Sequence, residues 1–148
     1  MNKKLFEKNK HDFRKKFFLI VFLITLFPFS VFCEEEASYI LKGPLAGAFY
    51  YTEQKPGRWY KLINSHKPIL EIEGNILEVT TPHEMKGHDH FIIKHIIMDN
   101  KLNIISEKIF DPSSEIPVSK HNISGYTDRL FIISICNKHD MWLNIFNF

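Results

Sequence analysis

Short apolar runs separated by turn-forming residues dominate the chain after residue 60. The runs at residues 69–73 and 76–80 flank Gly74-Asn75, and residues 70–73 and 77–80 within them alternate apolar and polar side chains, a pattern typical of a β-hairpin. Three further runs predict strands at residues 91–98, 102–110 and 129–136, and a last one at 141–148. The run at 129–136 is apolar on both faces, which predicts a strand that is covered on both sides.

The remaining segments are polar or rich in turn formers. Residues 34–60 form a lead-in containing three glycines and two prolines, with short strands expected at 39–41 and 49–52. Residues 117–128 are polar and are assigned no strand, and no segment beyond residue 33 sustains a helical period. Several short strands at this spacing predict an all-β fold, a β-sandwich or a barrel.

The first 33 residues have a different character. A basic stretch at residues 1–16 precedes an apolar stretch at 17–32, the pattern of a secretory signal. The apolar stretch is shorter than the roughly 20 residues that a membrane-spanning helix needs. We therefore expect a cleavable signal helix at residues 1–33 and an exported protein of the periplasm or cell envelope. Retention of the leader as a membrane anchor and lipidation of Cys33 are the alternatives.

Charge and cysteine content narrow the picture. Residues 1–33 hold seven of the 19 Lys and Arg but two of the 17 Asp and Glu, so the rest has a net charge of −3. An acidic remainder gives no reason to expect nucleic-acid binding. It is long enough for one core, and we divide it into the lead-in at 34–60 and a domain at 61–148. Without Cys33, Cys136 is a single thiol, which needs either a metal or burial for protection.

Cys136 and His139 follow the apolar run within one tight turn, and His66, His83 and His90 lie near the edges of predicted strands. Structural zinc usually takes two or more cysteines, whereas one thiolate with several imidazoles favours iron or copper. Each histidine alone is more often structural than a ligand, but the ordered set together with Cys136 favours a metal site. His95 and His121 belong to no motif.

These residues resemble the iron domain of superoxide reductases, the desulfoferrodoxin and neelaredoxin family. Residues 64–71, NSHKPILE, are similar to the family's E-K-H-x-P-x-(I/L)-E, and residues 56–59, PGRW, to the G-x-W before it. Residues 81–85, TPHEM, followed by HFI at 90–92, are similar to V-x-H-P-M-x-x-x-H-(Y/F/H)-I. Residues 136–142, CNKHDMW, are similar to C-N-x-H-G-x-W.

The resemblance implies an immunoglobulin-like β-sandwich holding one mononuclear iron in the single-iron form of the family. The implied ligands are four equatorial histidines and axial Cys136, listed as His66, His83, His90, Cys136 and His139. The implied reaction is reduction of superoxide to hydrogen peroxide in defence against oxidative stress. It implies an external electron donor such as a rubredoxin-like protein, and it leaves homo-oligomerisation open.

The chain departs from the family pattern at several positions. Asn64-Ser65 replace a Glu-Lys pair. Lys67 and Lys138 therefore become the candidates for the catalytic positive charge, in addition to catalytic Cys136. Lys86 is also near in sequence. The His83-to-His90 interval is one residue longer than in the family, which makes His88 the alternative third ligand. Glu84 replaces a proline, and Asp140 replaces a glycine.

Two other functions remain open at this point. The first is a cupredoxin-like electron carrier that uses Cys136, His139 and Met141 for copper. The second is a family member that binds iron without catalysis, an interpretation supported only by the absence of the Glu-Lys pair.

Overall fold

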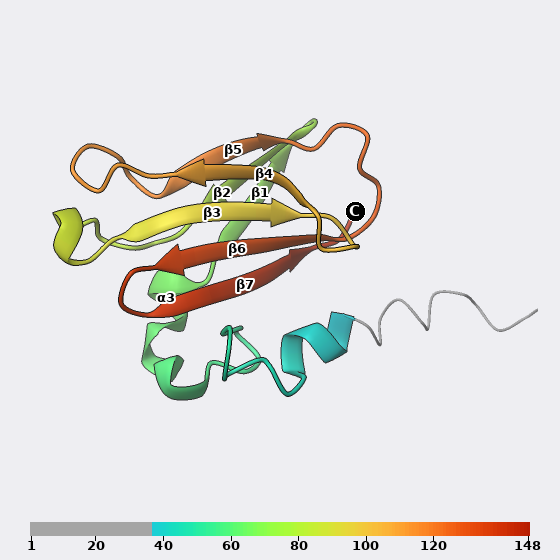
Figure 1. Cartoon of the computed structure of the whole chain (residues 1–148). Helices are drawn as coiled ribbons and strands as arrows, with labels where there is room; N and C mark the ends of the chain where they lie inside the picture. Colours follow the sequence, from blue (N-terminus) through green and yellow to red (C-terminus); the bar gives the residue numbers. More distant parts are fainter. Residues whose placement is uncertain (1–36) are drawn as a thin grey trace, which may run out of the picture. The chain divides into compact units, whose positions relative to one another are not determined.

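The computed structural model describes residues 37–148, whose strands form two antiparallel sheets (Figure 1). One sheet has the order β1-β2-β5, with β1 Ile69–Glu73, β2 Ile76–Thr80 and β5 Val118–Asn122. The other has the order β4-β3-β6-β7, with β3 Ile92–Met98, β4 Ile104–Ile109, β6 Leu130–Cys136 and β7 Asp140–Phe146. The all-β sandwich expected from the sequence is therefore confirmed.

The expected signal segment at residues 1–33, with Cys33, lies outside the described residues. Within residues 37–148, no helix is both long enough and apolar enough to cross a membrane.

The strand pattern of the sequence is reproduced closely in the first sheet. β1 and β2 pair from Ile69 with Thr80 to Glu73 with Ile76, and Gly74 takes a φ of 59° in the turn between them. This left-handed conformation suits glycine, which lacks the Cβ that would clash. The predicted bounds of the hairpin are confirmed to the residue.

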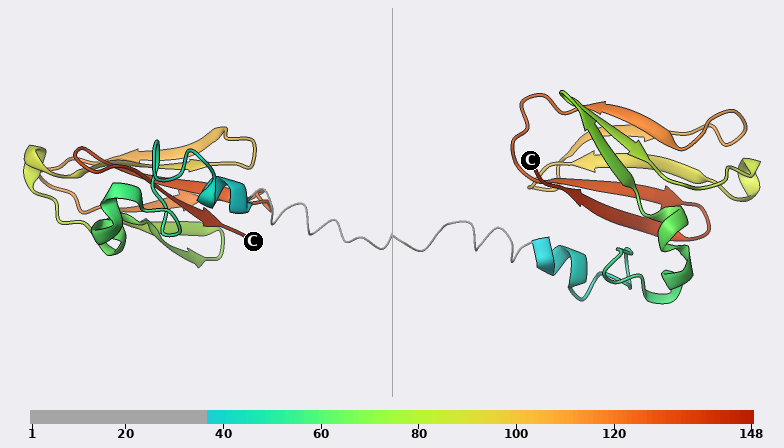
Figure 2. Two further views of the ribbon diagram at one scale, coloured as in Figure 1. Left: turned by 90° about the horizontal axis from the view of Figure 1, so that it is seen from below. Right: turned by 180° about the vertical axis from the view of Figure 1, so that it is seen from behind.

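Two apolar layers explain why β6 is apolar on both faces. Between the sheets lies a core of fully buried side chains from three strands and a loop: Leu77, Val79, Ile97, Ile123, Leu130 and Ile132. On the other face of β6, Phe131 and Ile133 pack with Ile96 and Leu143 in a second cluster. Ile40, Leu41 and Tyr50 of the lead-in pack against that second cluster. Residues 37–52 thus help to cover the outer face of the four-stranded sheet, as Figure 2 shows.

The lead-in differs from its prediction. Residues 37–42 are helical, so the strand expected at 39–41 is wrong. Near the strand expected at 49–52, Tyr51 forms a single parallel bridge with Trp142 of β7. The 3-10 helix η1, Gly57–Leu62, and the short helix α3, Ile63–His66, follow it and were not expected.

β5 lies within the polar segment at residues 117–128, where the sequence predicts no strand. Its buried side chains are Ser119 and His121, and they belong to a hydrogen-bonded network between the sheets. His95 Nδ1 lies 2.7 Å from Ser119 Oγ, and His95 Nε2 lies 2.9 Å from Thr81 Oγ1. Because each buried polar group has a partner, the burial of this polar strand carries no large desolvation penalty.

The buried His95 predicts an acid-sensitive fold. Burial lowers the pKa of His95 to about 3, against an ordinary value of 6.5, and burial also lowers the pKa of His121. As pH falls below 6.5, His95 becomes protonated in the unfolded chain but stays neutral in the folded protein. The free energy of unfolding therefore decreases until the pH reaches about 3. Each pKa unit of separation is worth about 1.4 kcal/mol.

We therefore expect the melting temperature of the chelator-treated protein to fall between pH 7 and pH 4. His95→Gln should show a shallower dependence on pH, although its stability at pH 7 is lower. Circular dichroism melts of both proteins across this pH range measure the two slopes. Equal slopes would show that His95 does not remain neutral in the fold.

Candidate metal centre

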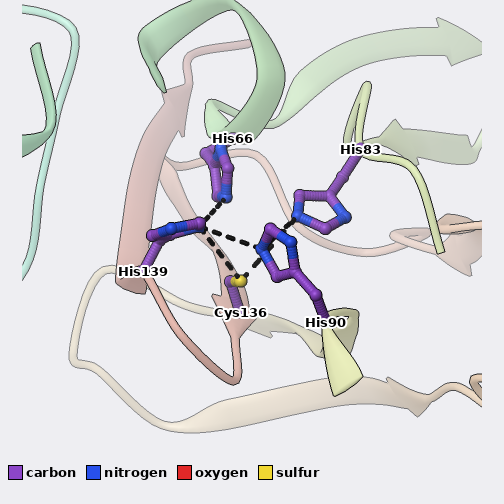
Figure 3. A group of neighbouring side chains, drawn as sticks. All are labelled: His66, His83, His90, Cys136 and His139. Carbon is purple, nitrogen blue, oxygen red and sulfur yellow. Dashed lines mark hydrogen bonds between the residues drawn. The ribbon is translucent and has the colours of Figure 1, made fainter. Parts of the chain in front are cut away.

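Five side chains that are far apart in the sequence meet at one end of the sandwich (Figure 3). Their ligand atoms all lie within 4.8 Å of one another. His66 ends α3, and Cys136 ends β6, so regular elements position both. The other three lie in connections: His83 after β2, His90 just before β3, and His139 between β6 and β7. The structure brings together the residues that the sequence singled out as ligands.

The four imidazoles present one nitrogen each to a common centre. His83 Nε2 lies 2.9 Å from His90 Nε2, and His90 Nε2 lies 3.0 Å from His139 Nδ1. His139 Nδ1 in turn lies 2.9 Å from His66 Nε2. A metal that binds nitrogens at about 2.0–2.1 Å and right angles places adjacent nitrogens about 3 Å apart. The spacing of these donor atoms therefore fits a square arrangement around one metal ion.

The thiol of Cys136 completes the donor set. Its Sγ lies 3.7 Å from His139 Nδ1 and 3.9 Å from His83 Nε2, and the side chain is buried. The backbone N–H of Lys138 donates to this sulfur at 3.5 Å. Hydrogen bonds of this kind tune the electron density of a metal-bound thiolate.

The electrostatics of the cluster favour a cation at its centre. Burial, followed by the neighbouring histidines, lowers the pKa of His66 to about 3 and that of His83 to about 4. Burial also lowers the pKa values of His90 and His139, so all four rings are neutral at pH 7 with lone pairs free to bind. Burial raises the pKa of the Cys136 thiol, and a metal cation offsets that cost by holding the thiolate.

Ser65 supports His66 from behind. Its hydroxyl lies 2.8 Å from His66 Nδ1 and donates to the carbonyl oxygen of Leu62 at 3.1 Å. A hydroxyl whose proton is committed to Leu62 can accept from His66 Nδ1–H, which leaves Nε2 unprotonated toward the centre. Ser65, which stands where the superoxide reductase pattern has a lysine, thus orients the His66 ring.

Asn137 supports His90 in a similar way. Its Oδ1 accepts from the backbone N–H of Phe91 at 3.0 Å, and its Nδ2 donates to the carbonyl oxygens of His88 and Asp89. These contacts tie the loop before β3 to the β6–β7 turn. The Asn137 side chain therefore holds in place the loop that contains His90.

A cavity of about 190 Å³ opens over the imidazoles. Its lining comprises the four histidines of the cluster with Leu62, Ser65, Glu84 and Lys86, and it does not include Cys136. The cavity therefore reaches the imidazoles but not the sulfur. Lys86 Nζ lies 3.0 Å from Glu84 Oε2, and 56% of the lysine side chain is exposed. An exposed ion pair of Lys86 and Glu84 thus stands at the mouth of the cavity.

The other candidates from the sequence lie elsewhere. Lys67 forms an ion pair with Glu53 at 2.9 Å, and neither Lys67 nor Lys138 lines the cavity. His88 packs edge-on against Phe91 and is not part of the cluster. The sequence marked Lys86 only as a neighbour in the chain, because its place at the cavity depends on the path of the loop.

This is the fold of superoxide reductases, combined with a five-residue His/Cys cluster suited to a metal. The chain is similar in structure to the superoxide reductase (neelaredoxin) from Ignicoccus hospitalis, with a TM-score of 0.52 and 17% identity over 68% of this chain and 94% of that one. It is also similar to the superoxide reductase (1Fe-SOR) from Giardia intestinalis, with a TM-score of 0.50 and 18% identity over 57% of this chain and 99% of that one. No family model and no curated protein sequence matches the chain.

Proposed function

We propose that this protein is a superoxide reductase with one mononuclear iron held by His66, His83, His90, His139 and Cys136. One observation carries the proposal: four imidazole nitrogens lie about 3 Å apart with a thiol behind them and an accessible cavity in front. Similarity to superoxide reductases in fold and in the order of the ligand motifs supports the same conclusion.

Iron in this donor set would supply the single electron that converts superoxide, with two protons, into hydrogen peroxide. The Cys136 thiolate would hold the iron together with the imidazoles and would raise its electron density. The neutral imidazoles fill their positions without adding negative charge that would repel the anionic substrate. The open cavity admits a small anion and supplies solvent protons, and an external donor, such as a rubredoxin-like protein, restores the electron.

Lys86 is the cation that we assign to substrate capture. It lines the cavity, whereas neither Lys67 nor Lys138 does. Electrostatic steering can raise association rates by roughly 10-fold or more. In this proposal Lys86 takes the part that the sequence assigned to Lys67 and Lys138.

Lys86→Gln is therefore expected to slow the second-order reaction with superoxide by about 10-fold and to flatten its dependence on ionic strength. Pulse radiolysis at several salt concentrations measures both effects. Lys120→Gln is the matched control, because Lys120 is exposed to a similar extent and also pairs with a glutamate at 3.0 Å. Lys67→Gln tests the sequence prediction, and a larger effect there than in Lys86→Gln would overturn the assignment.

The copper alternative gains no support from the structure. A cupredoxin-like site would need Met141 as a ligand. Met141 instead packs against the second cluster, beside Phe131 and Leu143. Four imidazoles also exceed the two of a blue-copper site.

Metal analysis tests the proposed site. After anaerobic reconstitution we expect one iron per chain and, on oxidation, an absorption band from sulfur-to-iron charge transfer. A preparation that retains only zinc or copper and does not bind iron would contradict the proposal.

We also propose export to the periplasm or cell envelope, on the pattern of residues 1–33. Mass spectrometry of the mature N-terminus in the native host tests this proposal.

A further inference from the structure

Asp140 has an unusual backbone for a residue with a side chain. It follows His139 directly, pairs with Cys136 across the turn, and has a φ of 63°. Among the described non-glycine residues, only Leu102 shares a positive φ. Aspartate tolerates this left-handed conformation better than most residues, but glycine adopts it without a steric cost. The presence of a carboxylate at this position therefore calls for an explanation.

The carboxylate binds two side chains of η1. Asp140 Oδ2 accepts from Arg58 Nη2 at 2.6 Å and from Trp59 Nε1 at 2.9 Å. The Arg58 guanidinium also lies 4.8 Å from the centre of the Trp59 ring. The ion pair with Arg58 is exposed and adds little stability by itself. The hydrogen bond from Trp59 Nε1 to the same carboxylate oxygen fixes the position of the Trp59 ring.

Trp59 in turn contacts a ligand. Its ring packs edge-on against the His139 ring, with centroids 4.8 Å apart and an interplanar angle of 73°. The carbonyl oxygen of His139 accepts from Trp142 Nε1 at 3.2 Å, so the backbone of His139 is held from a second side. His139 differs from the other three histidines in presenting Nδ1 rather than Nε2 to the centre. The ring must therefore be held at a different angle from the others.

We infer that Asp140 is a positioning residue for His139: its carboxylate holds Trp59 against the imidazole and thereby keeps His139 Nδ1 facing the other donor atoms. The inference rests on the proposed metal site. It also explains why a carboxylate stands beside the cluster, since Arg58 offsets its negative charge. Loss of an outer partner of a ligand typically weakens metal binding 10- to 100-fold.

Competition of the purified protein with a chromogenic chelator for Co²⁺ tests this inference without any assay of catalysis. We expect Asp140→Asn and Asp140→Gly to raise the dissociation constant for Co²⁺ about 10-fold and to shift the visible Co²⁺ absorption bands. Trp59→Phe, which keeps a ring but removes the N–H, should act in the same direction. A double substitution of Asp140→Gly with Trp59→Phe should cost little more than either alone, because both break the hydrogen bond between Trp59 Nε1 and residue 140.

Glu107→Gln is the matched control. Glu107 accepts from Lys94 at 3.0 Å, and its exposed fraction of 42% is close to the 40% of Asp140. We expect this variant to bind Co²⁺ as the original protein does. Binding within twofold of the original protein in both Asp140→Gly and Trp59→Phe overturns the inference. Failure of the unaltered protein to bind Co²⁺ would instead count against the proposed metal site.

Discussion

Cys136→Ser is expected to abolish the sulfur-to-iron charge-transfer band and to lower the rate of superoxide reduction by more than 100-fold. Serine is close to cysteine in size, so the four imidazoles should stay in place. The substitution removes the thiolate that would raise electron density at the metal. Loss of an outer partner of a ligand typically costs about 10- to 100-fold in metal affinity or activity, and loss of a direct ligand should cost more. Absorption spectra of the oxidised protein and pulse radiolysis of the reduced protein measure the two effects.

The chain offers a control for this substitution. Cys33 is the other of its two cysteines and lies in the predicted leader. Cys33→Ser should leave both the band and the rate unchanged. A Cys136→Ser protein that keeps the original rate would show that the sulfur is not part of the reacting centre.

The second large effect concerns the choice between two neighbouring histidines. His90→Ala is expected to reduce retained iron at least 10-fold, because His90 Nε2 lies 2.9 Å and 3.0 Å from the nitrogens of two other ligands. His88→Ala should keep about one iron per chain, because the His88 ring packs on Phe91 outside the cluster. Metal analysis after gel filtration in the presence of a weak chelator makes the comparison.

This pair of variants is matched in residue type and lies on the same loop. Iron loss in His88→Ala together with iron retention in His90→Ala would reverse the assignment. Such a result would also mean that Asn137 holds the loop in a different path from the one described here.

Local patterns in the sequence predicted most of the sandwich. The hairpin of β1 and β2 was found to the residue because alternation and a glycine turn are short-range signals. β6 was found because its apolar run is covered on both faces. β5 was missed because its buried residues, Ser119 and His121, are polar and depend on partners from other strands. No pattern within β5 itself shows that those partners exist.

The helix at residues 37–42 was missed for a related reason. It is too short to show a helical period, and its apolar side chains are organised by the outer face of the four-stranded sheet. Here tertiary packing decides the local structure.

The donor set was predictable because ligands are specified by residue type and order. The functions of the surrounding residues were not, because they depend on how loops fold over the site. Lys86 and Glu84 come to the cavity, whereas Lys67 turns to Glu53. Ser65 becomes a hydrogen-bond partner of His66, and Asp140 becomes the partner of Trp59. Each of these contacts joins segments or backbone groups whose meeting cannot be inferred from spacing.

The most direct test of the central claim is the product balance when superoxide is supplied to the iron-loaded protein with an external reductant. We expect one hydrogen peroxide for each superoxide consumed and no release of dioxygen, with one electron taken from the reductant for each superoxide. Release of one dioxygen for every two superoxide ions, without consumption of reductant, would indicate dismutation and contradict the account. Absence of any superoxide consumption by protein that holds one iron per chain would contradict it as well.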